Sequence, residues 1–380
     1  MTLSKAEDAQ GGLEQVSAKD RVSSLTGVRA VAATLVVATH AAYTTGKYTH
    51  GYIGLLYSRM EIGVPMFFAL SGFLLFRPWV QAAVNGRPAP SVRRYAWHRF
   101  RRIMPPYVVT VLACYVIYHF RIAEPNPGHT WYGLLRNITL TQIYTDNYMY
   151  SFLHQGLTQM WSLAVEASFY VALPLLAYVL LVLLCRRRWR PLLLIAGIGA
   201  LALITPAWIV LVHWTTWLPD GARLWLPTYL LWFLGGMLLS VLQAMGVRGY
   251  AVLTLPVAVV SYFIVSTPLA GEPTTSPYAA SEALVKAGFY AFIATLLIAP
   301  VALGDHGWYV RLLSTRPMVW LGEISYEIFL IHLVVMEIAM IKVLQQPVYT
   351  GSAGALFVTT MVLTVPLAWL LHRFTRVRSS

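Results

Sequence analysis

The sequence predicts an all-α integral membrane protein with about ten transmembrane helices and both termini in the cytoplasm. Of its 380 residues, 58% are hydrophobic and only 11% are charged, whereas charged residues make up about a quarter of soluble domains. Apolar runs of about 20 residues, the length that a helix needs to cross a bilayer, recur along the whole chain. Lysines and arginines gather in alternate loops between these runs, as the positive-inside rule requires.

Ten apolar segments are the candidates for these helices. They are 27–45, 62–80, 103–120, 162–185, 191–213, 224–245, 250–268, 284–303, 319–342 and 353–372. The segment before them, 1–24, is polar and lacks apolar periodicity, so we expect a disordered cytoplasmic tail there. The transmembrane domain would then cover 25–373, and a short basic cytoplasmic tail, 374–380, would follow it.

The distribution of positive charge supports this topology. With the N-terminus inside, the cytoplasmic segments hold 19 lysines and arginines and the external loops hold six, which indicates a multi-pass protein of the inner (plasma) membrane. Topology therefore explains the net charge of +13 without a nucleic-acid partner. A signal peptide over 1–41 is the alternative, but a small-x-small cleavage site is lacking and nine helices would remain. Cys114 and Cys185 have no metal-ligand spacing, so neither a disulfide framework nor a metal site is expected.

The first apolar segment, GVRAVAATLVVATHAAY, contains Arg29 and His40. A charge near the bilayer centre costs about 2.5–3.5 kcal/mol even on the lenient insertion scale, so it needs a partner, a water-filled cavity or a function. Eleven residues turn a helix to within about 20° of three full turns, which puts both side chains on one face, about 16 Å apart along the axis. The alternative is a snorkelling arginine and an interfacial histidine, but the shared face favours a functional pair.

The third and fourth segments carry further polar residues. Arg99 and Arg102 stand one helical turn apart at the cytoplasmic end of the third segment. Two guanidinium groups at this spacing suit a phosphate or pyrophosphate, because each offers planar, bidentate donors; a topology-setting or lipid-headgroup patch is the alternative. In the fourth segment, Glu166 has Ser162 and Tyr170 four residues to either side on one helix face. A structural pair with a buried arginine is the alternative for Glu166.

Two more segments combine apolar and polar residues. FFALSGFLLF contains Ser71 followed by a glycine, a pair that is also ordinary in small-residue helix packing. WLGEISYEIFLIHLVV contains Ser325 and His332, seven residues apart and therefore on one helix face, with Tyr326 adjacent to the serine.

Together these segments resemble the membrane-bound acyltransferase 3 family, which contains bacterial O-acyltransferases acting on cell-surface polysaccharides, glycolipids and some secondary metabolites. The motifs, in order over about 300 residues, are LTGVRAVAATLVVATHA, FFALSGFLL, RRIMPPY, WSLAVEASFY and LGEISYEIFLIH. They are similar to the family's opening Arg-x10-His helix, its second helix, its Arg-x-x-Arg segment, its Trp-Ser-Leu-x-x-Glu helix and its late helix ending in histidine. Thr26 and Glu323 depart from the pattern, standing where an acidic and a basic residue are usual. The chain resembles the minimal, transmembrane-only members.

The resemblance implies an O-acyltransferase that uses cytoplasmic acyl-CoA, most simply acetyl-CoA, as a co-substrate, with no permanently bound cofactor or metal. Arg99 and Arg102 would hold the CoA phosphates, and Arg29 would mark the inner mouth of a polar corridor. His40 would meet the thioester and act as general base on the acceptor hydroxyl, and Glu166 would orient or recharge it. Further candidates for substrate binding or the tunnel wall are Ser71, Tyr107, Ser162, Ser325, Tyr326 and His332.

The expected acceptor is a hydroxyl of a cell-envelope glycolipid or glycan, for example a trehalose-mycolate-type glycolipid. A macrolide or other secondary-metabolite sugar is the alternative acceptor. A proton-coupled transporter or exporter of an envelope lipid or small molecule is the alternative class, because it would also bury histidine, arginine and glutamate. Such transporters usually contain internal repeats, and the two halves of this sequence show no convincing one. The expected partners are thus acyl-CoA, a carbohydrate- or glycolipid-type acceptor and membrane lipids.

Overall fold

The computed structural model describes residues 2–121, 126–148, 153–273 and 279–376, with side chains from Ser23 onward, and this part of the chain is helical without a β-strand. Its α-helices are α1 (Thr2–Thr44), α2 (Gly51–Arg59), α3 (Gly63–Val84), α4 (Val92–Phe120), α5 (Trp131–Ile138), α7 (Met160–Ala177), α8 (Pro191–Ala202), α9 (Ile204–Trp214), α10 (Leu226–Ala244), α11 (Ala251–Val265), α12 (Ala280–Ala302), α13 (Trp308–Leu313), α14 (Arg316–Glu323), α15 (Ser325–Ile338) and α16 (Ala353–Thr375). Short 3-10 helices are η1 (Lys47–Thr49), η2 (Met60–Ile62), η3 (Gln155–Leu157), η5 (Asp220–Leu224) and η6 (Pro268–Ala270), and η4 (Tyr178–Leu184) and η7 (Ala339–Val343) are π-helical.

The apolar helices coincide with the ten predicted segments, but not all of them are single spans. In the described chain, eight helical stretches are long and apolar enough to cross a membrane. The predicted span 319–342 is instead the pair α14 and α15, bent by 69°. The predicted span 250–268 ends early as α11, because Thr267 precedes Pro268 and adopts the extended conformation that this position favours. The protein is therefore a multi-pass membrane protein, whereas the count of ten and the cytoplasmic termini stay predictions.

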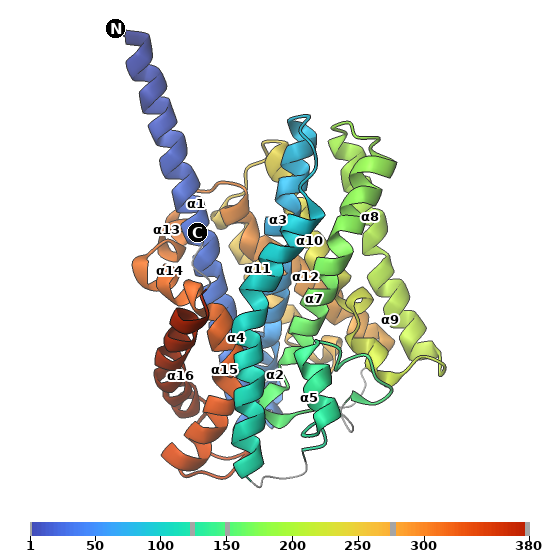
Figure 1. Cartoon of the computed structure of the whole chain (residues 1–380), viewed down its shortest axis with the longest axis vertical. Coiled ribbons are helices and arrows are strands. Elements are labelled where there is room, and N and C mark those ends of the chain that lie inside the picture. Colours follow the sequence, from blue (N-terminus) through green and yellow to red (C-terminus); the bar gives the residue numbers. More distant parts are fainter. Residues whose placement is uncertain (1, 122–125, 149–152, 274–278, 377–380) are drawn as a thin grey trace.

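The ends of the chain differ from the expectation in one respect. The sequence predicts a disordered segment at 1–24, whereas α1 begins at Thr2 and projects from the bundle at its N-terminal end (Figure 1). Residues 2–22 contain no proline and many good helix formers, such as alanine, glutamate, lysine and glutamine, so local propensity favours continuing the helix. At the other end, α16 runs to Thr375, and 377–380 of the predicted basic tail lie outside the described residues.

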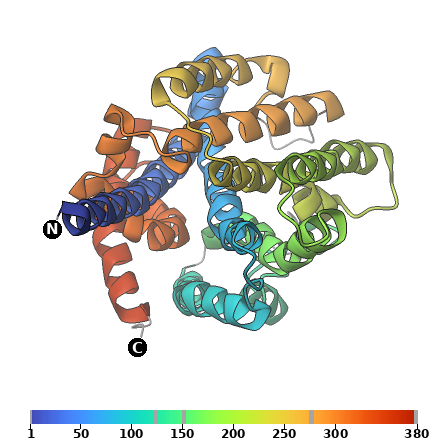
Figure 2. The same cartoon turned by 90° about the horizontal axis from the view of Figure 1, so that it is seen from above.

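The first and last helices of the chain lie side by side. α1 packs against α14, α15 and α16, and Figure 2 shows α1 grouped with these C-terminal helices on one side of the bundle. On its other side α1 packs against α3, which in turn contacts α7, α10 and α12. This arrangement brings side chains near the start and the end of the sequence into contact.

A close crossing of α3 and α10 fixes the centre of the bundle. A Cβ atom on Gly72 would overlap the carbonyl oxygen of Phe233, and one on Gly236 would overlap the carbonyl oxygen of Ala69. Small residues let two membrane helices approach closely, and packing then stabilises the contact. The predicted small-residue packing is thus correct for Gly72, while its neighbour Ser71 has a different environment.

Candidate active site

Most of the predicted site residues line one of two neighbouring cavities. The first, the arginine cavity, measures about 460 Å³ and is lined by Arg29, Ser71, Arg77, Arg99, Arg102 and Glu166 among others. The second, the histidine cavity, measures about 800 Å³ and is lined by His40, Glu61, Tyr148, Arg223, Thr228 and Lys286 among others. Val64, Ser162 and Phe329 line both. The cavities therefore adjoin at these three residues, with Arg29 on one side and His40, three turns further along α1, on the other.

Four arginines from three helices surround the arginine cavity. Arg29 comes from α1, Arg99 and Arg102 come from the first third of α4, and Arg77 comes from α3. The first three were predicted from the sequence and Arg77 was not, although an arginine inside the predicted span 62–80 is itself an unusual feature that costs free energy to bury. Four guanidinium groups around one cavity create a strongly positive site for an oxyanion such as phosphate.

Glu166 is held by hydroxyl groups and not by an arginine. Its Oε1 accepts hydrogen bonds from Ser71 and from the hydroxyl of Tyr170, the latter at 2.6 Å. Among the described residues, no ion pair involves Glu166, so the alternative of a structural pair with a buried arginine is not found. Glu166 lines the arginine cavity and has no hydrogen bond to His40, so the structure does not bring together the pair that the sequence analysis expected.

The remaining tunnel candidates divide into lining and structural residues. Ser325 and Tyr326 both line the arginine cavity, where the Ser325 hydroxyl donates to the carbonyl of Gly322 at 2.8 Å. Tyr107 lines neither cavity. It is fully buried in a hydrophobic cluster, and its hydroxyl donates to the carbonyl of Asn137 at 2.6 Å. Its expected role in the tunnel wall stays a prediction, and an apolar environment and a backbone partner already explain a buried tyrosine.

His40 and His332 form a hydrogen-bonded pair between α1 and α15. Nδ1 of His40 lies 3.0 Å from Nε2 of His332, and the ring centroids are 5.1 Å apart. His332 is completely buried, while His40 is partly exposed and lines the histidine cavity. The sequence analysis named both histidines but did not predict their contact, because 292 residues separate them.

The backbone fixes the proton positions in this pair. Nδ1 of His332 lies 2.8 Å from the carbonyl oxygen of Phe329, and because a carbonyl can only accept, this nitrogen carries a proton. In the neutral ring Nε2 of His332 is then an acceptor, so Nδ1 of His40 must donate to it. Nε2 of neutral His40 consequently has a free lone pair, and no described protein group is hydrogen-bonded to it. This is the state that a general base needs.

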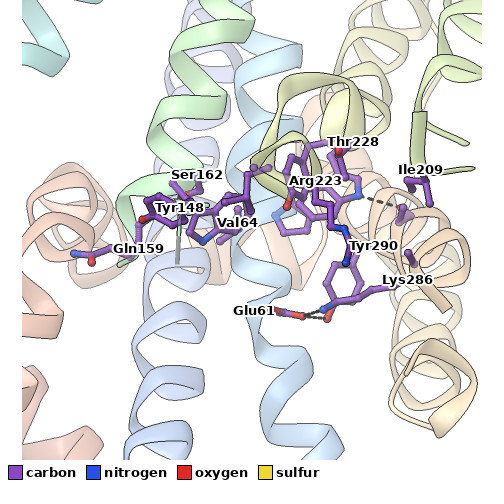
Figure 3. Close-up of a pocket in the computed structure, with 18 of the residues that line it drawn as sticks. Glu61, Val64, Tyr148, Gln159, Ser162, Ile209, Arg223, Thr228, Lys286 and Tyr290 are labelled. Atoms are coloured by element: carbon purple, nitrogen blue, oxygen red, sulfur yellow. Dashed lines mark hydrogen bonds and ion pairs between the residues drawn. The ribbon is translucent and has the colours of Figure 1, made fainter. Parts of the chain in front are cut away.

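The histidine cavity combines an ion pair with aromatic rings (Figure 3). Nζ of Lys286 lies 2.5 Å from a carboxylate oxygen of Glu61, which also accepts a hydrogen bond from Tyr290 at 2.8 Å. Further rings follow one another along the wall: the centroids of Trp161 and Tyr229 are 5.0 Å apart, and those of Tyr229 and Trp232 are 4.8 Å apart. The sequence analysis missed these residues, because charges and aromatic side chains are ordinary at the ends of membrane helices.

Comparison with known proteins assigns the chain to a family. A family model described as an acyltransferase domain, the acyltransferase 3 type, matches residues 22–373. The chain is 28% identical over 378 residues to the acyltransferase MdmB of Streptomyces mycarofaciens, covering 93% of this chain and 90% of that protein. It is 23% identical to the O-acetyltransferase OatA of Staphylococcus aureus, covering 82% of this chain and 51% of that protein. It is 25% identical to the peptidoglycan O-acetyltransferase OatA of Listeria monocytogenes, covering 82% of this chain and 49% of that protein.

The chain thus spans about half the length of these two OatA proteins. No solved structure matches it.

Proposed function

The chain belongs to the acyltransferase 3 family, and from this membership and the two cavities we propose that it transfers an acetyl group from acetyl-CoA to a carbohydrate hydroxyl. The donor occupies the arginine cavity and the acceptor occupies the histidine cavity. The acceptor belongs to an envelope glycan or glycolipid, and the enzyme lies in the plasma membrane. The observation that carries the proposal is the free lone pair on Nε2 of His40 in the wall of the second cavity.

The arginine cavity supplies what an acyl-CoA needs. The CoA head carries a pyrophosphate and a 3′-phosphate, and guanidinium groups bind such oxyanions through paired, charge-assisted hydrogen bonds. Arg99 and Arg102 in the first third of α4, together with Arg77 of α3, provide three of these groups. The step of eleven residues from Arg29 to His40 corresponds to about 16 Å of helix, on the order of the length of the pantetheine arm. The thioester of a donor held by these arginines can therefore reach the junction at Val64, Ser162 and Phe329.

His40 performs the proton transfers. As the acceptor hydroxyl attacks the thioester carbonyl carbon, its proton moves to Nε2 of His40 and a carbon–oxygen bond forms. The carbon–sulfur bond then breaks, and the leaving CoA thiolate takes that proton, so His40 returns to its neutral state. The products are the O-acetyl ester and free CoA. His332 positions His40: it donates from Nδ1 to the carbonyl of Phe329 and accepts at Nε2 from Nδ1 of His40, which holds the His40 ring and its tautomer.

Glu166 has a different role from the one that its motif first indicates. It lies among the arginines and is fixed by Ser71 and Tyr170, so we place it as a negative charge that balances the guanidinium cluster next to the donor. A net positive potential remains for the phosphates, while the carboxylate offsets part of the mutual repulsion of the arginines.

Purified protein in lipid nanodiscs tests the proposal. Incubation with acetyl-CoA and a panel of methyl glycosides should release CoA thiol, and mass spectrometry should detect one acetyl ester for each thiol released in excess of the background hydrolysis. A transporter or exporter would leave acetyl-CoA intact while moving a solute across a vesicle membrane. Binding of acetyl-CoA without thiol release or ester in any condition would refute the proposed reaction.

A further inference from the structure

The histidine cavity contains a cation without a counter-ion. Arg223, at the end of η5, lines this cavity (Figure 3). Among the described residues it forms neither an ion pair nor a hydrogen bond, and its Nε is buried without a partner. The other cation of the cavity, Lys286, is neutralised by Glu61 at 2.5 Å. Asp220 also lines the cavity but makes no ion pair with Arg223.

A second unpartnered group lies five residues further along the chain. Oγ1 of Thr228 is buried without a hydrogen-bond partner, and Thr228 lines the same cavity. It belongs to the first turn of α10, where the helix dipole favours negative charge. Buried polar atoms in native proteins are almost always satisfied, so an unsatisfied donor and hydroxyl in one cavity wall point to a bound group that satisfies them.

The rest of the wall shows what kind of molecule carries that group. Trp161, Tyr229 and Trp232 present a row of aromatic rings, with the centroids of neighbouring rings 5.0 and 4.8 Å apart. Aromatic rings pack well against the apolar faces of flat, amphipathic molecules such as sugars, whose edges then meet the polar groups. A guanidinium that has no ion pair and lines the same cavity as this row suits an oxyanion on the same molecule, because it offers bidentate donors.

We propose that the acceptor is an anionic carbohydrate, whose carboxylate or phosphate group is bound by Arg223 and Thr228 while its sugar ring packs on the aromatic row. The inference rests on the proposed function, because it assigns the acceptor to the histidine cavity. Arg223 thereby sets specificity: it selects the acceptor by charge, while the Glu61–Lys286 pair, already neutral as a unit, does not discriminate. Carboxylate and phosphate share the required chemistry, and the experiment separates them.

The test uses the full chain in nanodiscs and three matched probes: methyl glucoside, methyl glucuronide and methyl glucoside 6-phosphate. Quenching of tryptophan fluorescence reports binding, since two tryptophans line the cavity. At least one charged probe should bind about 10- to 100-fold more tightly than methyl glucoside, the size expected for a charge-assisted pair. The tighter of the two identifies the oxyanion. Arg223→Gln should abolish this preference, and Arg223→Lys should restore part of it.

Lys47→Gln is the matched control, because it removes a cation from a residue that lines neither cavity. It should keep the full preference. The preference is a ratio measured on one preparation, so a misfolded fraction of any variant does not change it. Equal binding of neutral and charged probes by the wild type, or a preference that survives Arg223→Gln, would overturn the inference. Thiol release from acetyl-CoA in the same samples reports the proposed function separately, so the two ideas can fail independently.

Discussion

The arginine cavity and the histidine cavity differ in charge, size and surface although they share three residues. The first measures about 460 Å³ and combines four arginines with two glutamates, Glu166 and Glu323. The second measures about 800 Å³ and combines aromatic rings, a closed ion pair and a single unpaired arginine. A multiply charged, narrow molecule matches the first cavity, and a broader molecule with flat faces matches the second. The contrast teaches that the two cavities suit molecules of different chemistry, and under the proposed function donor and acceptor would meet where both are lined by Val64, Ser162 and Phe329.

Replacement of His40 should have the largest effect, because His40 is the only proton acceptor proposed for the reaction. His40→Ala should lower acetyl transfer by roughly 10²- to 10⁴-fold while expression and folding stay normal. His50→Ala is the matched control, since His50 is exposed and lines neither cavity. Initial rates of ester formation measure both variants. Near-normal transfer by well-folded His40→Ala protein would remove the base from this account.

Replacement of His332 should lower the rate of acetyl transfer less than replacement of His40, because His332 acts only by positioning His40. His332→Leu should lower kcat by about 10- to 100-fold, the range typical of residues that orient an active group through a hydrogen bond. His332→Gln should lose less, because its amide oxygen can still accept from Nδ1 of His40. The KM for acetyl-CoA should be unchanged in both variants. A rise in this KM with constant kcat would show that His332 shapes the donor site instead.

Replacement of Arg99 or Arg102 in α4 should affect only the binding of the acyl donor. Arg99→Gln and Arg102→Gln should each raise the KM for acetyl-CoA by roughly tenfold, as expected for a lost charged hydrogen bond, with partial rescue by lysine. Arg101→Gln is the matched control, because Arg101 stacks over Trp97 outside the cavity. The effect should shrink for acetyl-pantetheine, which lacks the phosphates. Equal fractional losses with both donors would indicate a lipid anchor and not a phosphate site.

The hydroxyls that hold Glu166 should have the smallest effect. Tyr170→Phe removes one of two donors to its carboxylate, but Ser71 still donates to the same oxygen and Glu166 takes no proton in the proposed reaction. Only part of the roughly 1.5–3 kcal/mol of a charged hydrogen bond should therefore be lost, and transfer should fall only about fivefold. Tyr178→Phe is the control, because Tyr178 lies in η4, directly after α7, and is half exposed. Steady-state kinetics compare the two. A loss as large as that of His40→Ala would mean that Glu166 takes part in proton transfer.

The sequence predicted the arginine cavity far better than the histidine cavity, for a physical reason. Arg29, Ser162 and Glu166 stand inside apolar runs, where the cost of burying polar groups makes them conspicuous. Glu61, Arg223 and Lys286 lie at helix ends and in short connections, where charged residues are ordinary. No local pattern indicates that they surround a cavity.

Contacts between residues far apart in the chain also could not be predicted from the sequence. Periodicity placed Arg29 and His40 on one face of α1, and the structure keeps both on cavity walls. The partner of His40 is on α15, 292 residues away, and only the packing of α1 against the C-terminal helices reveals it. The expected link from Glu166 to His40 failed for the same reason: the spacing within one helix does not say which neighbour that helix faces.

Sided reconstitution tests the central claim, that donor and acceptor reach the junction through separate cavities, most directly. The added cysteine of an Ala89→Cys variant, in the loop between α3 and α4, reports orientation in liposomes through an impermeant thiol reagent, because the two native cysteines, Cys114 and Cys185, are buried. Acetyl-CoA is then supplied on one face and an impermeant methyl glycoside on the other. The account predicts ester only when acetyl-CoA is on the Ala89 face and the glycoside is opposite. Ester formation that requires both substrates on the same face would contradict it.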